Sequence, residues 1–270
     1  MSKLTTITIL VLIIGGTFSQ ASCQEKLDID GAILIGKASG LSNQSGTIQW
    51  TGSDLLLWNG SKWVSLTNGI AFDGQVTDID GNSYRTIQIG SQEWMAENLR
   101  TTKYNDGSVI LQTNNYQNWQ SSNVGAWCWY DTSAIYEPSY GKLYNWYAVN
   151  DSKVLCPTGW HVPTDADWTT LTNFLGGESG AGGKLKEKGL AHWLSPNIDA
   201  TNESGFTGLP GGFRESNGTF FEFGTYGSWW TGTEYQTNFA WYRNLYTING
   251  DVGRFTTGKN PGRAVRCLKN

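Results

Sequence analysis

The chain has 270 residues, 16% of them charged, and a formal net charge of −4. Average soluble proteins are about 25% charged and about 7% glycine, so the 34 glycines and the low charge favour an exported, loop-rich protein. The 39% hydrophobic content and only 6 prolines exclude a disordered or collagen-like chain. With no basic block, nucleic acid is not an expected partner.

Residues 1–22 are predicted to form a signal peptide. One positive charge in residues 1–3 precedes an apolar run over residues 4–18, which is shorter than the roughly 20 residues of a membrane span. Two cleavage sites compete. Residues 19–21 fit ordinary signal peptidase, whereas the stretch ending at Cys23 resembles a bacterial lipobox and would make Cys23 a lipidated N-terminus. In both cases the protein is exported, and a lipid on Cys23 is the only membrane contact we expect.

Residues 25–70 are predicted to form a small β-rich module. Strand-like runs flank Asn59-Gly60, a pair that favours a tight type I′ hairpin turn. About 45 residues give a thin core, so we expect the module to pack on the next domain or to self-associate. Residues 46–66 resemble the strand-rich stalk segments that precede head domains in phage tail-fibre-like and bacterial surface proteins, which implies a stalk.

Residues 72–270 are predicted to form one larger domain that opens with an Asp-Gly turn at residues 78–82. An EF-hand calcium loop is not expected there, because its glycine belongs at the sixth position and Gly81 stands fourth. The best-specified helix begins after Thr164 as N-cap and ends at Gly176-Gly177; its apolar stripe consists of Trp168, Leu171 and Leu175. A weaker helix is predicted over residues 183–188, followed by strands up to Leu268.

The remaining cysteines are Cys128, Cys156 and Cys267, so at most one intramolecular disulfide can form. They are widely spaced, and only His161 and His192 could assist them, so we expect no metal site and no cofactor. Cys128 stands between two tryptophans and is predicted to be a buried, unreactive thiol.

Six motifs occur in a fixed order in the second part of the chain. Together they resemble the Fibrobacter succinogenes major paralogous domain, a family of exported bacterial proteins, over about residues 75–269. The resemblance implies an extracellular or outer-membrane location on a bacterium, but no activity. The motifs are residues 93–100, 140–146, 156–164, 205–214, 229–231 and 264–267.

A more distant pattern concerns the fold. Residues 160–168 followed by Arg266-Cys267 are similar to C-type lectin-like domains and formylglycine-generating enzymes. The resemblance implies an α+β fold: a C-type-lectin-like head with short twisted antiparallel strands and one or two helices, preceded by the stalk. It also implies a Cys156–Cys267 disulfide. The late copper-binding cysteines of formylglycine-generating enzymes and the calcium-site motif of true lectins are absent, so neither activity is expected.

The aromatic residues suggest a function, because Trp and Tyr rings stack on sugar rings and dominate many binding surfaces. Adjacent residues of a strand point to opposite faces, so we expect one of Trp229 and Trp230 in the core and the other, preferably Trp230, at the surface. We therefore expect a non-enzymatic adhesion module for a polysaccharide or a surface protein. Two alternatives stay open: a structural envelope component without a small ligand, and a hydrolase or oxidase with an unrecognised site. The binding candidates are Trp229, Trp230, Tyr235, Trp241 and Tyr242.

Overall fold

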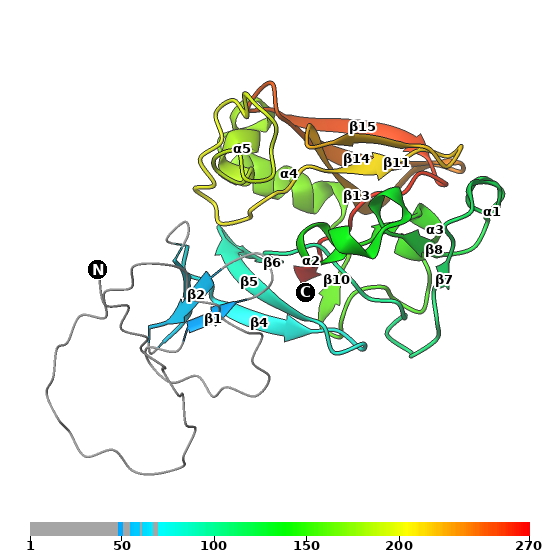
Figure 1. The fold of residues 1–270 in the computed structure, drawn as a ribbon, viewed down its shortest axis with the longest axis horizontal. Helices are drawn as coiled ribbons and strands as arrows, with labels where there is room; N and C mark the ends of the chain where they lie inside the picture. The colour runs from blue at the N-terminus through cyan, green and yellow to red at the C-terminus, as the bar shows by residue number, and fades with distance from the viewer. Residues whose placement is uncertain (1–47, 51–54, 60, 67–69) are drawn as a thin grey trace, which may run out of the picture. The chain divides into compact units, whose positions relative to one another are not determined.

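The computed structural model describes residues 48–50, 55–59, 61–66 and 70–270 (Figure 1). The predicted signal peptide, Cys23 and the first part of the predicted stalk lie outside the described residues. The described chain consists of short strands in several small, mostly antiparallel sheets, together with a few short helices. The α+β class is therefore confirmed. Among the described residues, no helix is long and apolar enough to cross a membrane.

The first sheet belongs to the predicted stalk. It contains β1 (Ile48–Trp50), β2 (Leu55–Trp58) and β3 (Trp63–Ser65), all antiparallel. The predicted hairpin is confirmed by the antiparallel pairing of β2 with β3, but its turn runs from Asn59 to Lys62, so Asn59 is not one of its two central residues. The Asn59 N–H donates to the Lys62 carbonyl oxygen, and the Asn59 side chain accepts from the N–H groups of Ser61 and Lys62. Asparagine stabilises such a turn through its own side chain, and the pattern did not resolve this register.

A five-stranded sheet joins the two ends of the larger domain, in the order β10-β16-β6-β5-β4. The hairpin between β4 and β5 is the predicted Asp-Gly turn, with Gly81 at a φ of 82°. Asp78 accepts hydrogen bonds there from Asp80, Asn82 and Tyr84, so its carboxylate stabilises the turn. The strands are β4 (Gly74–Thr77), β5 (Ser83–Ile89), β6 (Gln92–Met95), β10 (Trp160–His161) and β16 (Leu268–Lys269).

The longest strands form an antiparallel sheet of three, β13 (Tyr226–Gln236), β14 (Phe239–Tyr246) and β15 (Val252–Gly258). The helices α4 (Asp165–Phe174) and α5 (Glu178–Leu185) lie beside this sheet (Figure 1). The smaller elements are β7 (Leu111–Gln112), α1 (Tyr116–Gln120), β8 (Ala126–Cys128), η1 (Tyr130–Thr132), η2 (Ala134–Tyr136), α2 (Glu137–Tyr140), β9 (Leu143–Tyr144), α3 (Trp146–Val149), β11 (Gly211–Arg214) and β12 (Phe220–Phe223).

Helix α4 (Asp165–Phe174) begins and ends as the sequence predicts. The Thr164 side chain accepts from the Asp167 N–H, and the Asp167 carboxylate accepts from the Thr164 N–H, which completes a capping box. The three predicted stripe residues are all buried. The prediction for the second helix is wrong in position, because α5 spans Glu178–Leu185. Glycines 182 and 183 lie within it, where the backbone of neighbouring loops approaches too closely for a side chain.

A disulfide joins Cys156 to Cys267, as the resemblance implies. The bond ties the segment before β10 to the final strand, and the two strands pair directly at His161 and Leu268. Cys128 is the free cysteine of the described chain and is fully buried. Burial raises the pKa of its thiol to about 12, so the thiol stays protonated at neutral pH.

Candidate binding surface

The first half of β13 lies between two hydrophobic cores. Trp229 packs with Trp168 and Phe206 in one core, and Trp230 lies in the other, where its ring meets Tyr242 edge to face. Both rings are buried, so the prediction that one of the pair lies at the surface is wrong. The alternation argument was correct about direction, but it assumed a sheet with one solvent-exposed face.

The other three aromatic candidates lie on two different faces of the sheet. The Tyr235 and Trp241 rings meet edge to face, with centroids 5.0 Å apart. Tyr235 is 49% exposed and Trp241 is partly exposed. Tyr242 follows Trp241 in β14 and therefore projects to the opposite face, where its ring lies 3.6 Å from the Arg263 guanidinium carbon. Tyr235 and Trp241 form one surface, and Tyr242 belongs to another.

A guanidinium completes the surface around Trp241. The Arg254 guanidinium carbon lies 3.9 Å from the centre of a Trp241 ring, a cation–π arrangement. Two of its nitrogens are held by the Asp165 carboxylate: Nη2 lies 2.7 Å from Oδ2, and Nε lies 3.1 Å from both carboxylate oxygens. The third, Nη1, donates to no residue in the described part of the chain. We call Tyr235, Trp241 and Arg254 the aromatic–arginine surface.

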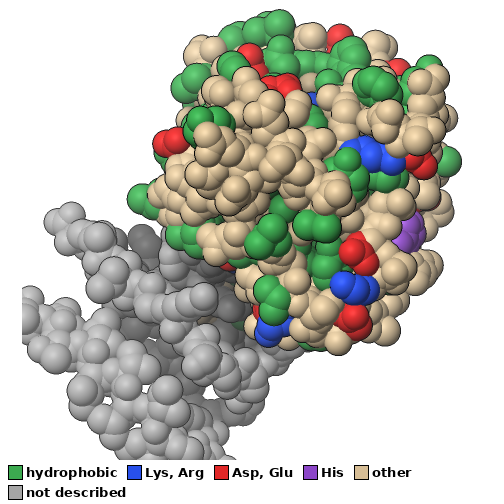
Figure 2. Space-filling model, turned by 90° about the vertical axis from the view of Figure 1, so that its right-hand side faces the viewer, with side chains coloured by type: hydrophobic (Ala, Val, Ile, Leu, Met, Phe, Trp, Pro, Cys, Tyr) green, Lys and Arg blue, Asp and Glu red, His purple; other side chains and the backbone are tan. Residues whose placement is uncertain are grey.

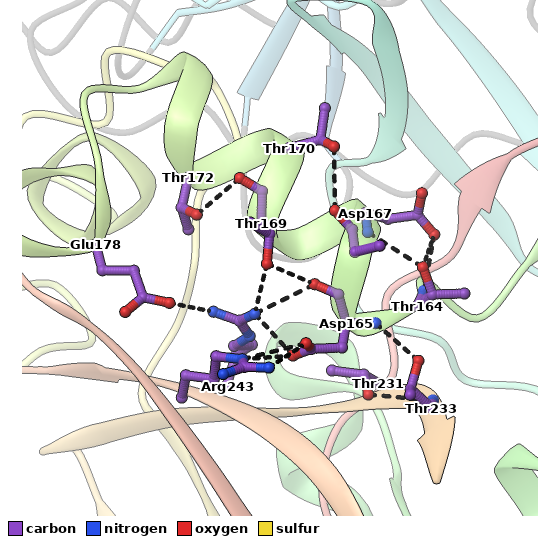
Figure 3. A network of polar contacts seen from close by, with 12 residues as sticks. Thr164, Asp165, Asp167, Thr169, Thr170, Thr172, Glu178, Thr231, Thr233 and Arg243 are labelled. Carbon is purple, nitrogen blue, oxygen red and sulfur yellow. Dashed lines mark hydrogen bonds and ion pairs between the residues drawn. The ribbon is translucent and has the colours of Figure 1, made fainter. Parts of the chain in front are cut away.

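A polar network under this surface fixes Asp165 (Figure 3). The Asp165 N–H donates to Thr233 Oγ1 at 2.9 Å, which joins the start of α4 to β13. Its carboxylate also accepts from the fully buried Arg243, which donates in turn to Glu178 at 2.9 Å. Figure 3 shows Arg243 between Asp165 of α4 and Glu178 of α5.

The charge state of Asp165 follows from this network. Burial alone would raise its pKa, but the hydrogen bond from Arg254 and the charge of Arg243 lower the pKa below its usual range. The carboxylate is therefore ionised at neutral pH and holds the Arg254 guanidinium over the Trp241 ring. Such an array offers an apolar face for stacking and N–H groups for hydrogen bonds to hydroxyl oxygens.

A polar hollow adjoins the hairpin that carries Tyr235. Its volume is about 450 Å³, and its lining includes Asn123, Tyr147, Asp151 and Lys259. Lys259 donates to the Glu234 carboxylate in this hairpin. A second hollow of about 310 Å³ shares residues 150–152 with the first. Sequence reasoning missed both hollows, because their linings come from segments far apart in the chain.

A second group of partly exposed rings was also missed. Its members come from the 130–140 loop region and from β12, and neighbouring rings lie 4.9 to 6.3 Å apart. Because the rings contact one another closely, they form a small satellite core under the loops. Spacing in the sequence gave no signal for it. The rings are Tyr130, Tyr136, Tyr140, Phe220 and Phe223.

His161, Glu203 and Glu234 have polar partners within the chain. His161 Nδ1 lies 2.7 Å from Asn270 Oδ1, and its Nε2 lies 3.2 Å from Asp167 Oδ2. Glu203 and Glu234 form ion pairs with Lys184 and Lys259. Within the described residues, no group of three or more His, Cys, Asp or Glu side chains could hold a metal ion.

Figure 2 shows how side chains of each type are distributed over one face of the molecule. On the face drawn in Figure 2, uncharged polar side chains and backbone dominate, and hydrophobic side chains form small separate groups. Charged side chains are scattered among them, with both signs present. This face therefore presents no broad apolar or single-sign patch.

Comparison with known proteins identifies the family. No curated protein and no solved structure matches the chain. The model of the Fibrobacter succinogenes major domain family matches residues 87–269. This range includes the disulfide, α4, α5 and the whole sheet β13–β15 that presents the aromatic–arginine surface. The chain belongs to the Fibrobacter succinogenes major domain family.

Proposed function

We propose that this protein is an exported, non-catalytic binding module that recognises a carbohydrate through the aromatic–arginine surface. The observation that carries the proposal is the partly exposed Tyr235–Trp241 pair with Arg254 fixed over Trp241 by Asp165. A sugar ring stacks its apolar face on such rings, while a fixed guanidinium donates hydrogen bonds to its hydroxyl groups at little entropic cost.

The finer features of the proposal rest on the sequence and the family. We propose a C-type-lectin-like topology for the head, cleavage of residues 1–22, and a location outside the cell or on the outer membrane of a bacterium. Lipidation of Cys23 would anchor the module, and residues 25–70 would act as the stalk. A polysaccharide is the partner that the aromatic–arginine surface favours over a surface protein, because stacking and hydrogen-bonding groups lie side by side.

A glycan array followed by polysaccharide pull-down tests the proposal, with the chain purified without residues 1–22. We expect Trp241→Ala to lower the affinity for the bound glycan at least tenfold, because it removes both the stacking ring and the surface on which Arg254 lies. Tyr116→Ala is the matched control, since it removes a ring that is 55% exposed on α1. If the folded wild-type chain binds no glycan, the carbohydrate proposal is wrong.

A structural envelope component is the second candidate. The observation that favours it is the burial of nine tryptophans among the described residues, where these rings pack in the cores. This role predicts that the folded chain binds no soluble glycan and that Trp241→Ala changes no interaction. The same glycan array therefore separates the two candidates.

A further inference from the structure

Arg263 is a buried cation without a carboxylate partner. Its side chain is enclosed, with the residue only 2% exposed, and burial lowers its pKa to about 10. Nη1 donates to Ser228 Oγ. Nε and Nη2, which form one edge of the guanidinium, donate to no residue in the part of the chain that the structure describes. Glu215 acts on Arg263 electrostatically but forms no ion pair with it.

The other fully buried arginines differ from Arg263 in this respect. Arg243 pairs with Asp165 through Nη2 and with Glu178 through Nη1, and among its three nitrogens only Nε lacks a partner in the described chain. Arg266 donates to Asn98 Oδ1 from Nε and Nη2, and to the Phe206 carbonyl oxygen from Nη1. Arg214 donates from all three of its nitrogens to backbone carbonyl oxygens. Among these four buried arginines of the described chain, only Arg263 lacks partners at two guanidinium nitrogens, which is unfavourable in a low-dielectric site.

The surroundings of Arg263 connect it to an exposed aromatic face. Tyr242 lies 3.6 Å from its guanidinium carbon and Phe213 lies 4.8 Å away, and both rings are partly exposed. Phe255 lies beside Tyr242 with ring centroids 5.9 Å apart and is 47% exposed. The Tyr242 ring lies over the guanidinium carbon of Arg263, so a ligand that approaches Arg263 from this face has to displace Tyr242.

We propose that this face binds an acidic sugar residue, whose carboxylate pairs with Nε and Nη2 of Arg263 while Tyr242 and Phe255 contact the sugar ring. A planar carboxylate matches a guanidinium edge with two parallel hydrogen bonds, and it supplies the missing counter-charge. The site is distinct from the aromatic–arginine surface, because Tyr242 and Trp241 project from opposite faces of β14.

The first test compares two forms of one polymer on the wild-type chain. By calorimetric titration, we expect polygalacturonate to bind at least tenfold more tightly than its fully methyl-esterified form, which has the same backbone without the charge. The net charge of −4 disfavours nonspecific binding of a polyanion. Equal affinity for the two forms would overturn the proposal. Binding of poly-glutamate as tight as that of polygalacturonate would also overturn it, in favour of an acidic peptide.

The second test uses variants of the same chain. Arg263→Met should lower the affinity for polygalacturonate at least tenfold without lowering the thermal midpoint, because an unpaired buried charge is replaced by an apolar chain of similar length. Lys188→Met, which removes an exposed charge, is the control and should bind as the wild type does. Undiminished binding by Arg263→Met would refute the site. If that variant does not fold, Arg263→Lys keeps the charge but loses the planar edge, and it should show the same loss of affinity.

These outcomes are independent of those for the proposed function. Neutral glycans on the array report on the aromatic–arginine surface, and polygalacturonate reports on Arg263. A chain that binds neither ligand contradicts both proposals, whereas binding of one ligand alone supports one proposal and contradicts the other.

Discussion

The two halves of β13 show how one aromatic-rich strand serves two purposes. In the first half, Trp229 and Trp230 are both buried, because a core covers each face of the strand. In the second half, Tyr235 is half exposed beside Trp241. The residue types are the same in both halves. Their roles depend on what covers each face of the sheet at that point.

The buried rings of β13 stabilise the fold, whereas we expect the exposed rings to contact a ligand. Rings in the buried half have fixed partners: Trp230 Nε1 donates to the Tyr144 carbonyl oxygen, and Trp229 Nε1 donates to Asn98 Oδ1, both at 2.8 Å. In the exposed half, the Nη1 group of Arg254 and the exposed part of the Tyr235 ring are available to a ligand. The connection between the halves is Asp165, which contacts buried Arg243 and exposed Arg254 together.

The largest expected effect is at the buried half. Trp230→Ala should lower the free energy of unfolding by about 3–5 kcal/mol, because it removes a large ring and leaves a cavity. Trp241→Ala should lower it by at most about 1 kcal/mol, since that ring is partly exposed. Urea unfolding followed by circular dichroism measures both. Equal losses for the two variants would contradict the division of β13 into a buried and an exposed half.

The next effect concerns the connection between the halves. Asp165→Asn should cost roughly 2–3 kcal/mol at pH 7, because buried Arg243 loses one of its two carboxylate partners. The lowered pKa of Asp165 means that its contribution is complete above pH 3.8, the ordinary pKa, and is lost as the pH falls through its folded-state pKa.

Urea titrations at pH 7, 4 and 3 test the pH dependence. The wild type should lose more stability than Asp165→Asn between pH 4 and pH 3. Arg254→Ala is the matched control at the exposed end of the same carboxylate, and it should cost under about 1 kcal/mol. Parallel pH curves for the wild type and Asp165→Asn would show that Asp165 does not carry this dependence.

The smallest effect is at the helix cap that positions Asp165. Thr164→Ala removes the acceptor for the Asp167 N–H and should cost about 1 kcal/mol. Thr164→Ser, which keeps a hydroxyl at the cap, should cost much less. Thermal unfolding of the two variants measures the difference. If Thr164→Ser is as unstable as Thr164→Ala, the hydroxyl is not the stabilising group.

Sequence reasoning succeeded where the signal was local. The capping box at Thr164, the apolar stripe of α4 and the Asp-Gly turn at Gly81 depend on residues within one or two turns of each other. It failed for α5, where glycines 182 and 183 are required by close contact with distant loops. It also failed for Trp230, because a second core on the far face of β13 has no local signature.

The sequence by itself determined the α+β class, the family and helix α4, since short-range hydrogen bonds and ordered motifs depend on residues that are close together in the chain. The Cys156–Cys267 pairing came from family resemblance, and the structure confirms it. Only the tertiary structure decided which aromatic rings are exposed, that Arg254 lies over Trp241, and that Arg263 has an unpaired edge. Burial and charge pairing depend on contacts between segments that are far apart in the chain, so no single stretch of sequence specifies them.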